Sequence, residues 1–451
     1  MPTHDLIIIG AGSGNSIIGP EHDGMDVAIV ERGLFGGTCL NVGCIPSKMF
    51  VYAAEVAELA AHVGPKLGVH TTFEGADWPA IRDRVFGRID PIAEGGEDYR
   101  KSLDNVTVYQ HDARFIGPKE IQVGGETITA DKIVIAAGAR AWAPPIDGLD
   151  EVGYHTSDTI MRLDELPKRL AVLGGGYIAT ELGNVFGMLG TEVTFIVRSD
   201  AMLRNEDEAI STAFTEAYKQ KFNTRFMSGV YSARRDGDEI VLDLFPDHEE
   251  LRVDAVLVAT GRVPNGDQLD LAAHGFAMDD DGYLITDSNL RTNVDGVFAL
   301  GDITNPVQLK HVANHEAKVV RHNLANPDSM IEVNHDFIPH AVFGHPQVAS
   351  VGMTERDAIA TGVDFTCHVQ HYASAAYGWA MEDTTSIVKL VMDSRTRLLL
   401  GAHICGPQAS TLIQQLIQGM VFGQTVDQMA TGQYYIHPAL PEVIEQALLE
   451  L

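Results

Sequence analysis

The sequence predicts an α/β protein made of two similar doubly wound units and a C-terminal α+β domain. A continuous apolar run leads into a glycine-rich turn at residues 5–14, and a second apolar run follows at 27–30. The same order of features recurs at residues 169–197. After residue 335, short strands alternate with one long amphipathic helix. A chain of 451 residues is long enough to form several such domains.

The composition excludes several classes of protein. A formal charge of −30 disfavours binding to nucleic acid or to an anionic membrane. No run of eighteen apolar residues occurs, and the first residues lack a basic region followed by an apolar one, so we expect neither a membrane span nor a signal peptide. Four cysteines are too few for a disulfide-stapled secreted scaffold. A cytoplasmic location is therefore expected.

The first unit carries the pattern of a dinucleotide-binding, Rossmann-like fold. A buried strand ends in Gly10 and Gly12, where the absence of side chains lets a pyrophosphate approach the backbone. The next strand ends at Glu31, an acid at the position that holds a ribose hydroxyl. Asn15 occupies the third glycine position, and Pro20 interrupts the stretch that follows. The helix between the two strands is therefore expected to be short.

Two cysteines five positions apart, Cys39 and Cys44, follow this unit. A regular helix would separate their Cα atoms by about 7.5 Å, whereas a disulfide needs roughly 7 Å or less, so a bridge requires irregular backbone at Gly43. Pro46 suits the first turn of a following helix, whose positive end favours a thiolate at Cys44, with Lys48 one turn further on. The spacing alone fits a reducible disulfide and two buried free thiols equally well.

The next hundred residues are expected to be mostly helical and then to return to the sheet. Amphipathic helices are predicted at 53–62 and 78–103, and strands at 106–109, 114–116 and 132–138, the last ending in Gly138. A Pro144-Pro145 pair then predicts a domain boundary.

The second glycine turn predicts a second Rossmann-like fold. The strand 169–173 leads into Gly174 and Gly176, with a helix expected through 181–189 and a strand at 193–197.

No acid ends this second β-strand. Arg198 and Arg204 follow it instead, and guanidinium groups suit a ribose 2′-phosphate, so NADP is favoured over NAD. The alternative is two solvated surface arginines.

Two further strand ends are candidates for the sites. The strand 254–260 ends at Gly261, where the second unit is expected to finish, and an apolar run at 296–300 delivers Asp302 beside a glycine. That aspartate suits a hydrogen bond to a sugar-like hydroxyl, and capping of the next segment is an equally good interpretation.

The C-terminal domain is predicted to hold strands and one long helix, without a nucleotide motif. The expected strands are Ala341 to Val351, Thr385 to Met392 and Leu398 to Ile404, and the expected helix runs from Ser410 to Phe422. Near the end, two prolines hold His437 and Glu442 five residues apart, which suits acid–base chemistry because the carboxylate can orient the imidazole. A solvated histidine in a turn remains the alternative.

Taken in order, the glycine-rich turn, GGTCLNVGC, the second glycine turn, ATGR, ALGD and HPALPE resemble the flavoprotein disulfide reductases of the glutathione reductase type. The resemblance covers nearly the whole chain. It implies an FAD-binding domain at 1–150 that continues at 266–335, an NADPH-binding domain at 151–265 and an interface domain at 336–451. It also implies a homodimer in which His437 acts across the subunit interface.

The resemblance assigns roles residue by residue. The implied FAD site comprises Gly10, Gly12, Glu31, Thr38, Lys48, Gly138 and Asp302. The implied NADPH site comprises Gly174, Gly176, Tyr177, Glu181, Arg198, Arg204 and Gly261. Electrons would pass from NADPH through FAD to a Cys39–Cys44 disulfide, with Cys44 next to the flavin and Cys39 attacking the substrate. His437 and Glu442 would form the acid–base pair, Lys48 would contact the flavin with Glu181 as its partner, and Tyr177 would cover the nicotinamide site.

Several stretches resemble the mycothione reductase branch, among them residues 12–17, 48–56, 85–92, 377–384 and 433–442. The implied substrate is mycothione, the disulfide of a sugar-bearing thiol, and the implied role is in cell redox homeostasis. The form CLNVGCIPSK also fits dihydrolipoamide dehydrogenase, which Arg198 and Arg204 oppose. Mercuric reductase is disfavoured because the C-terminal tail has no cysteine pair. A non-enzymatic zinc module fits the cysteine spacing poorly, so no metal is expected.

Overall fold

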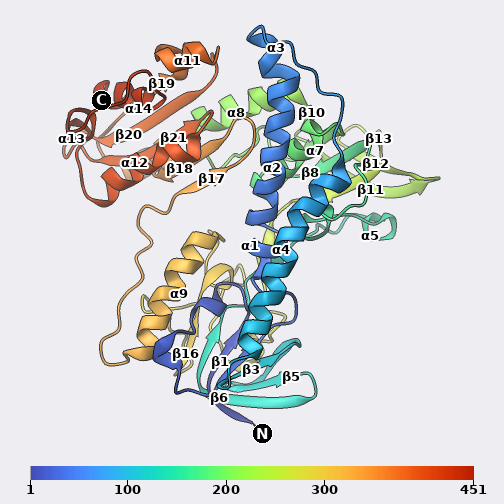
Figure 1. The fold of residues 1–451 in the computed structure, drawn as a ribbon, viewed down its shortest axis with the longest axis vertical. Helices are drawn as coiled ribbons and strands as arrows, with labels where there is room; N and C mark the ends of the chain where they lie inside the picture. The colour runs from blue at the N-terminus through green and yellow to red at the C-terminus, as the bar shows by residue number, and fades with distance from the viewer. Residues whose placement is uncertain (1) are drawn as a thin grey trace. The chain divides into compact units, whose positions relative to one another are not determined.

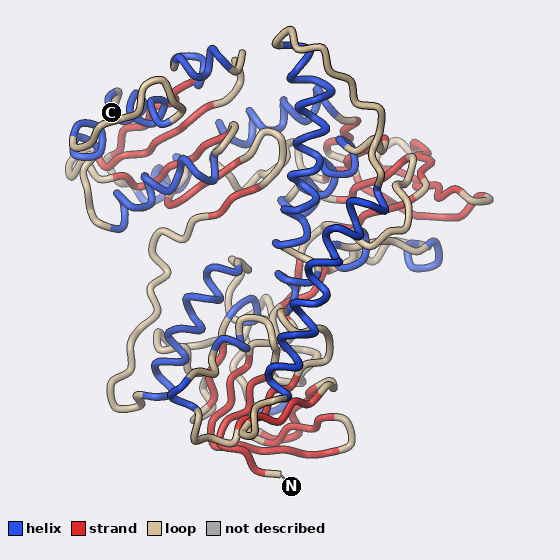
Figure 2. The backbone as a smooth tube through the Cα atoms, in the orientation of Figure 1, coloured by secondary structure: helices blue, strands red, loops and turns tan. Residues whose placement is uncertain are grey.

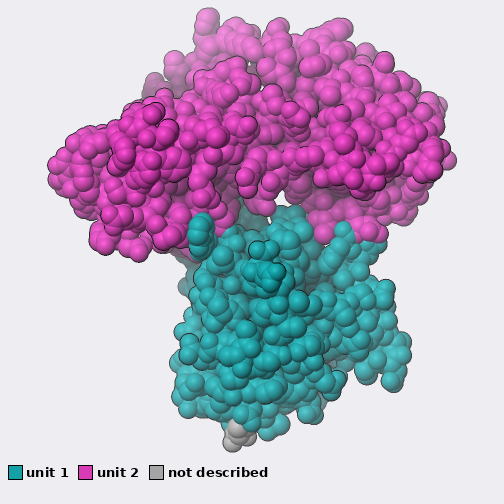
Figure 3. Space-filling view, turned by 180° about the vertical axis from the view of Figure 1, so that it is seen from behind, with its two compact units in different colours: residues 1–47, 82–142, 262–335 teal, residues 48–81, 143–261, 336–451 magenta. Residues whose placement is uncertain are grey.

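The computed structural model describes residues 2–451, which form two compact units (Figure 3). Unit 1 contains the residues up to Ser47 together with Arg82–Trp142 and Arg262–His335. Unit 2 contains Lys48–Ile81, Ala143–Gly261 and Asp336–Leu451. The assignment of individual ligands to four domains stays a prediction, because compactness alone does not identify what a domain binds.

Unit 1 is built on a sheet whose core strands are parallel (Figure 1), and its central strand β1 is buried on both faces. Its parallel strands lie in the order β3 (Val106–Tyr109), β2 (Val27–Val30), β1 (Thr3–Ile9), β6 (Glu126–Ile135) and β16 (Val297–Ala299). Leu6 and Ile8 of β1 pack into one apolar cluster and Ile7 and Ile9 into another. This explains why β1 is a continuous apolar run rather than an alternating one.

The remaining elements of unit 1 extend or cover this sheet. Strands β4 (Ala113–Gly117) and β5 (Glu120–Val123) add antiparallel to β6, and β7 (Ala139–Ala141) pairs with β15 (Arg262–Pro264). Helix α9 (Lys310–Ala325) packs Ala317 and Val320 into the cluster that holds Leu6 and Ile8. Two 3₁₀ turns, η4 (Ala272–His274) and η5 (Gly301–Ile303), complete the unit.

The segment between β1 and β2 forms less helix than expected. It contains only two 3₁₀ turns, η1 (Gly14–Ser16) and η2 (Pro20–His22), so the expected short α-helix is wrong. Pro20 begins the second turn, and Gly14 lies so close to the sheet that a Cβ would come 2.9 Å from the Ala136 Cβ. The first unit therefore has a glycine turn without the helix that normally follows it.

Residues 36–48, which carry Cys39 and Cys44 and are called the redox segment below, lead into helices whose residues are divided between the two units. Helix α1 (Gly37–Asn41) is followed by α2 (Cys44–Glu58), whose residues from Lys48 onward belong to unit 2. A π-helical turn (η3, Leu59–Val63), α3 (Gly64–Lys66) and α4 (Trp78–Lys101) come next. Within unit 2, the Trp78 ring stacks on Phe50 with centroids 4.9 Å apart and contacts Phe186 at 5.1 Å.

Unit 2 contains the second parallel sheet. Its strands lie in the order β10 (Asn223–Phe226), β9 (Glu192–Val197), β8 (Arg169–Leu173) and β14 (Ala255–Val258). Helix α7 (Tyr177–Met188) follows the glycine turn after β8, as expected, and α5 (Leu149–Val152), α6 (Ser157–Ile160) and α8 (Glu208–Lys221) complete this part.

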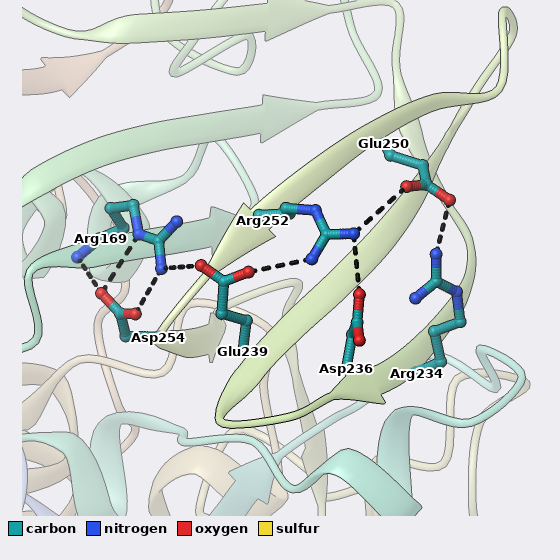
Figure 4. Close-up of polar contacts among 7 residues, drawn as sticks. All are labelled: Arg169, Arg234, Asp236, Glu239, Glu250, Arg252 and Asp254. Atoms are coloured by element: carbon teal, nitrogen blue, oxygen red, sulfur yellow. Dashed lines mark hydrogen bonds and ion pairs between the residues drawn. The ribbon is translucent and has the colours of Figure 1, made fainter.

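An antiparallel sheet, which the sequence did not predict, adjoins these strands. It consists of β11 (Gly229–Asp236), β12 (Glu239–Phe245) and β13 (Glu249–Val253). Ion pairs cross its surface: Glu239 accepts hydrogen bonds from Arg169 and Arg252, and Arg169 also binds Asp254 (Figure 4). These charged groups are about a third or more exposed, so they help to register the strands and contribute little to stability.

The C-terminal part of unit 2 is a five-stranded antiparallel sheet covered by helices, which Figure 2 shows in red and blue. The strand order is β17 (His340–Val342), β18 (Val348–Gly352), β21 (Leu399–Cys405), β20 (Ile387–Asp393) and β19 (Phe365–His371). The single strand expected at Ala341 to Val351 is wrong, because the Gly344–Pro346 stretch turns the chain into a hairpin. Strand β19 was not expected.

Six short elements complete this domain. They are α10 (Glu355–Thr361), η6 (Tyr372–Ser374), α11 (Ala376–Ala380), α12 (Ala409–Val421), α13 (Val426–Thr431) and α14 (Pro441–Leu449). Leu412, Leu416 and Ile444 pack onto the sheet with Leu390 and Ile404 in one apolar cluster. None of the helices within residues 2–451 combines the length and the apolar character that crossing a bilayer requires.

Candidate active site

The two glycine turns repeat one backbone geometry. Gly10 and Gly174 each follow the first strand of a parallel sheet with a positive φ, +103° and +132°. In both cases a Cβ would lie 2.3 Å from a carbonyl oxygen at the end of the neighbouring strand, that of Ala136 in unit 1 and that of Ala259 in unit 2. Only glycine fits either position. The shared constraint supports the interpretation of the chain as two copies of one nucleotide-binding fold.

In unit 1 the glycine turn packs directly against the redox segment. Gly37 has a φ of +64°, and a Cβ there would lie 2.8 Å from the Gly12 Cα. The Gly36 N–H donates to the Ala11 carbonyl over 3.0 Å. This contact of backbone on backbone places residues 38–44 beside the turn that would hold a pyrophosphate.

Glu31 lies at the end of β2, where the sequence predicted a ribose-binding acid. Its carboxylate accepts hydrogen bonds from the N–H groups of Ala11, at 2.7 Å, and Gly33, at 2.8 Å. The side chain is thus fixed against the glycine turn. Gly138, another predicted FAD residue, follows β6 at the same edge of the sheet with a φ of +64°.

Asp302 lies in η5 and is partly buried. Burial raises the pKa of its carboxyl group, and the positive charges of Arg262 and Lys310 partly oppose this rise. The backbone beside it is held because the Gly301 N–H donates to the buried Glu316 over 2.6 Å. Its own backbone N–H donates to the Asp302 carboxylate, and no other side chain among residues 2–451 binds it, so the carboxylate can still accept a hydrogen bond from a ligand hydroxyl.

The two cysteines of the predicted redox pair lie on consecutive helices as thiols rather than as a disulfide. Cys39 lies in α1, and Cys44 is the first residue of α2, where the helix dipole favours a thiolate. Gly43 allows this approach, because a Cβ there would lie 2.9 Å from the Thr38 carbonyl oxygen and 3.3 Å from the Cys39 Cα. Glycine is thus needed at position 43 because the backbone there lies close to Thr38 and Cys39, and not because its φ is positive.

The two thiols interact with each other. A hydrogen bond to Cys44 raises the pKa of the Cys39 thiol, burial raises it further, and the positive charge of Lys310 opposes the rise. Cys39 is therefore held in its protonated form while the pair is reduced. A base must remove this proton before Cys39 can act as a nucleophile.

Replacing Gly43 with alanine is expected to lower disulfide turnover by up to about 10²-fold, because the new Cβ would push Cys39 away from Cys44. Steady-state NADPH oxidation with a disulfide substrate measures the effect. Gly87→Ala is the matched control, since a Cβ at Gly87 meets no atom within 4 Å. Equal turnover in both variants would contradict the close-contact role of Gly43.

Lys48 and Glu181, both in unit 2, form the ion pair that the sequence predicted. The Lys48 Nζ lies 2.5 Å from the Glu181 Oε2, and the Phe343 N–H donates to the Glu181 Oε1 over 2.8 Å. The Lys48 Nζ also lies 4.7 Å from the centroid of the Phe343 ring. Phe343 therefore holds both partners of the ion pair, a role that its position in the sequence did not suggest.

The second glycine turn leads into a true helix. Gly176 is the N-cap of α7, and Tyr177 is its first residue, with 47% of its surface exposed. An exposed aromatic ring at the start of this helix is where a movable cover over the nicotinamide would lie. Gly261, at the end of the sheet, has a φ of +142°.

Arg198 and Arg204 flank the loop after β9 and are both exposed. The loop is tied to the glycine turn, because the Leu203 N–H donates to the Gly175 carbonyl over 2.8 Å. Neither arginine has an ion-pair partner within residues 2–451. Both guanidinium groups are therefore available to an anionic ligand.

Two acids that lie two and three residues after Arg204 fix the end of this loop, and no sequence pattern indicated their partners. Glu206 accepts a hydrogen bond from the His340 Nε2 over 2.6 Å, and Asp207 accepts one from the Lys389 Nζ over 2.8 Å. Both acids and Lys389 are buried. The C-terminal sheet thus pairs both of these carboxylates, which follow the predicted phosphate site, with basic side chains.

His437 and Glu442 are in contact, as predicted. The His437 Nδ1 lies 2.6 Å from the Glu442 Oε1, and the Ala439 N–H donates to the Glu442 Oε2 over 3.2 Å. The hydrogen bond from His437 holds the pKa of the Glu442 carboxyl group below its usual value. The His437 side chain is 73% exposed, and its Nε2 makes no hydrogen bond within residues 2–451. Nε2 is therefore presented at the surface.

Comparison with known proteins identifies the family. Residues 4–317 match the model of the pyridine nucleotide-disulphide oxidoreductases, and residues 338–448 match the dimerisation domain of the same proteins. The chain belongs to the pyridine nucleotide-disulphide oxidoreductase family. It is therefore an oxidoreductase that acts on sulfur groups and uses FAD and NADPH, as the motifs predicted. The α/β fold class with its Rossmann-like units is likewise confirmed.

Individual relatives in this family span the whole chain. The chain is 48% identical to a mycothione reductase of Mycobacterium tuberculosis (strain ATCC 25618 / H37Rv), with 100% of both covered. It is 31% identical to a dihydrolipoyl dehydrogenase of Bacillus subtilis (strain 168), covering 98% of this chain and 95% of the relative. The solved HOCl-induced flavoprotein disulfide reductase RclA from Escherichia coli matches with a TM-score of 0.87 at 26% identity, covering 99% of both chains.

The structure separates the predicted site residues between the two units. Unit 1 contains Cys39, Cys44 and every predicted FAD residue except Lys48, including Thr38 in α1. Unit 2 contains Lys48, the predicted NADPH residues and the His437–Glu442 pair. The close approach of Gly10, Gly12 and Gly37, together with the Asp302 carboxylate, which no other side chain binds among residues 2–451, fits a dinucleotide in unit 1.

Proposed function

We propose that the chain is an NADPH-dependent FAD enzyme that reduces mycothione through a Cys39–Cys44 disulfide. The observation that carries this proposal is the hydrogen-bonded pair of thiols, Cys39 in α1 and Cys44 at the start of α2, in a chain 48% identical over its full length to a mycothione reductase. The enzyme acts as a homodimer in the cytoplasm and contributes to cell redox homeostasis.

In unit 1, Gly10 and Gly12 would let the FAD pyrophosphate reach the backbone, Glu31 would bind the adenosine ribose, and Asp302 would accept a hydrogen bond from the ribityl chain. Bound FAD supplies a carrier that passes electron pairs from NADPH to the cysteines. The residues of this chain position that carrier and move the protons.

Thiol–disulfide exchange follows from the cysteine geometry. His437 of the partner subunit takes the proton of the Cys39 thiol, and the Cys39 Sγ attacks one sulfur of mycothione. One S–S bond forms and one breaks, and the departing mycothiol sulfur receives the proton back from His437. The Cys44 Sγ then attacks the Cys39 Sγ, which breaks the mixed disulfide and forms the Cys39–Cys44 bond, and the second mycothiol leaves with the proton that the Cys44 thiol gives up. Two electrons leave the cysteine pair, which ends as the Cys39–Cys44 disulfide.

The surface around His437 supports its action across a dimer. Tyr434 is fully exposed and Ile436 is 74% exposed, and both flank His437 in the match to the family's dimerisation domain. Exposed apolar residues in a row indicate a protein interface. A second copy of the chain that covers these residues would place the His437 Nε2, which has no hydrogen bond within residues 2–451, beside the cysteine pair of that second copy.

The nucleotide preference rests on the loop after β9. Arg198 and Arg204 are unpaired cations within residues 2–451, and no acid ends β9, so the site would bind a 2′-phosphate rather than repel it. Glu181, paired with Lys48, and Tyr177 would line the nicotinamide side.

A side-by-side assay tests the proposal. NADPH oxidation is measured with mycothione, glutathione disulfide and lipoamide, and then with NADH in place of NADPH. We expect mycothione with NADPH to give the highest kcat/KM. Faster turnover of lipoamide, or turnover with NADH equal to that with NADPH, would favour a dihydrolipoamide dehydrogenase, to which the chain is also related.

A further inference from the structure

The FAD site of unit 1 lacks the usual source of positive charge for a pyrophosphate. In a Rossmann-like fold, the N-terminus of the helix after the glycine turn provides that charge. Here only the 3₁₀ turn η1, three residues long, follows Gly12. The second glycine turn differs, since it opens the 12-residue helix α7. A dinucleotide bound at the first turn needs compensation from elsewhere.

A lysine from the other end of unit 1 reaches this turn. The Lys310 Nζ donates to the Ser13 Oγ over 2.9 Å, and Ser13 follows Gly12 directly. The Ser13 Oγ in turn donates to the Asn314 Oδ1 over 3.2 Å, one turn further along α9. The start of α9 is thus bound to the turn where a pyrophosphate would lie.

No carboxylate of the described residues is in direct contact with the ammonium group of Lys310. Its side chain is partly buried, and it forms no ion pair with a carboxylate in the described residues 2–451. Its hydrogen-bond acceptor, Ser13, is neutral. The field of Lys310 reaches both sides of the site, because it opposes the rise in the pKa of Asp302 and of Cys39. A partly buried ammonium group without a counter-ion is most stable beside an anionic ligand.

A second cation, Arg100, fixes the same turn through hydrogen bonds to Asn15. Arg100 of α4 donates to the Asn15 Oδ1 and to the Asn15 carbonyl, both over 2.7 Å. Both acceptors belong to Asn15, which occupies the third glycine position. Arg100 therefore fixes the part of the turn that close packing of a helix would otherwise fix. Lys310, which binds the neutral Ser13, is therefore a cation available to a phosphate at this turn.

We propose that Lys310 pairs with the pyrophosphate of FAD and replaces the missing helix N-terminus at the first glycine turn. This inference rests on the proposed FAD site. It assigns Lys310 a direct role in binding the cofactor and gives Arg100 a positioning role through Asn15.

Binding to FAD-free protein tests the inference without relying on turnover. The FAD dissociation constants of wild type, Lys310→Met, Lys310→Arg and Lys318→Met are measured by calorimetry. Loss of a charge-assisted hydrogen bond is expected to weaken FAD binding about 10- to 100-fold in Lys310→Met. Lys310→Arg should restore much of it. Lys318→Met removes an exposed lysine from the same helix and should bind FAD as wild type does.

Fragments of the cofactor separate a phosphate contact from a change in fold. ADP and adenosine are titrated into the same FAD-free proteins. Lys310→Met should lose affinity for ADP and keep its affinity for adenosine, and the salt dependence of ADP binding should weaken. An equal loss for both ligands, or FAD binding within twofold of wild type, would overturn the role of Lys310. If Lys310→Met does not fold, Lys310→Gln takes its place. Failure of the wild type to bind FAD would instead overturn the proposed function.

Discussion

Replacing Cys39 with serine is expected to reduce mycothione turnover by at least about 10³-fold, because a hydroxyl cannot replace the sulfur that attacks the substrate. NADPH should still reduce the protein and an artificial dye acceptor, since neither step needs Cys39. Stopped-flow absorbance after NADPH addition and steady-state assays with dye and with mycothione measure the two halves separately. A variant that keeps a tenth or more of the mycothione turnover would contradict the role of Cys39.

Two further variants sharpen this test. Cys44→Ser leaves Cys39 able to attack but unable to be released, so the protein should accumulate one mycothiol per chain as a mixed disulfide, visible by mass spectrometry. Cys367→Ser removes a cysteine from β19 in unit 2 and should keep turnover unchanged. If Cys367→Ser lost as much activity as Cys39→Ser, the assignment of the redox pair would be wrong.

His437→Ala is expected to lower mycothione turnover by about 10²- to 10⁴-fold while leaving the reaction with NADPH intact. The Cys39 thiol explains the size of the effect, because its raised pKa keeps it protonated at neutral pH. Without His437 the thiolate must form unaided, and its fraction grows as the pH rises toward the raised pKa. The residual turnover should therefore increase with pH across the alkaline range. A flat pH profile with wild-type turnover would remove His437 from the mechanism.

Two controls for His437 use another exposed histidine and the exchange of subunits in the dimer. His371→Ala removes an exposed histidine at the end of β19 and should have no effect. Mixing the Cys39→Ser and His437→Ala proteins under conditions that exchange subunits should restore activity, since one site of each mixed dimer has an intact Cys39 and an intact partner His437. No recovery in confirmed mixed dimers would place His437 in the site of its own chain.

Local backbone constraints made much of the fold predictable. Gly10 and Gly174 stand where no other residue fits, and the apolar runs at β1, β2, β8 and β9 are buried on both faces, so strands and turns followed from residue type. Antiparallel strands at the surface are harder, because their side chains are partly polar and their pairing depends on distant segments. For that reason β11–β13 and β19 were missed. The pattern predicts one strand across β17 and β18, since the apolar residues 341–343 and 348–349 are separated by only four residues.

The site residues likewise fall into those that local motifs predict and those that depend on distant segments of the chain. Cys39, Cys44, His437 and Glu442 lie in short motifs whose spacing carries the chemistry, and the structure shows both pairs in contact. Lys310 acts on a turn 297 residues earlier in the chain, so no local pattern reveals it. The one available signal was the interrupted stretch after Gly12, which leaves a phosphate site short of positive charge. Recognising such a deficit in a sequence shows where a distant cation is required.

The close contact at Gly43 also bears on how far the backbone must move between the oxidised and the reduced form. Cys39 and Cys44 already interact as thiols, and Gly43 lets the backbone of Cys39 and the start of α2 approach each other. We therefore expect the two forms to share one main-chain conformation in this segment, so that electron transfer needs little rearrangement of the backbone.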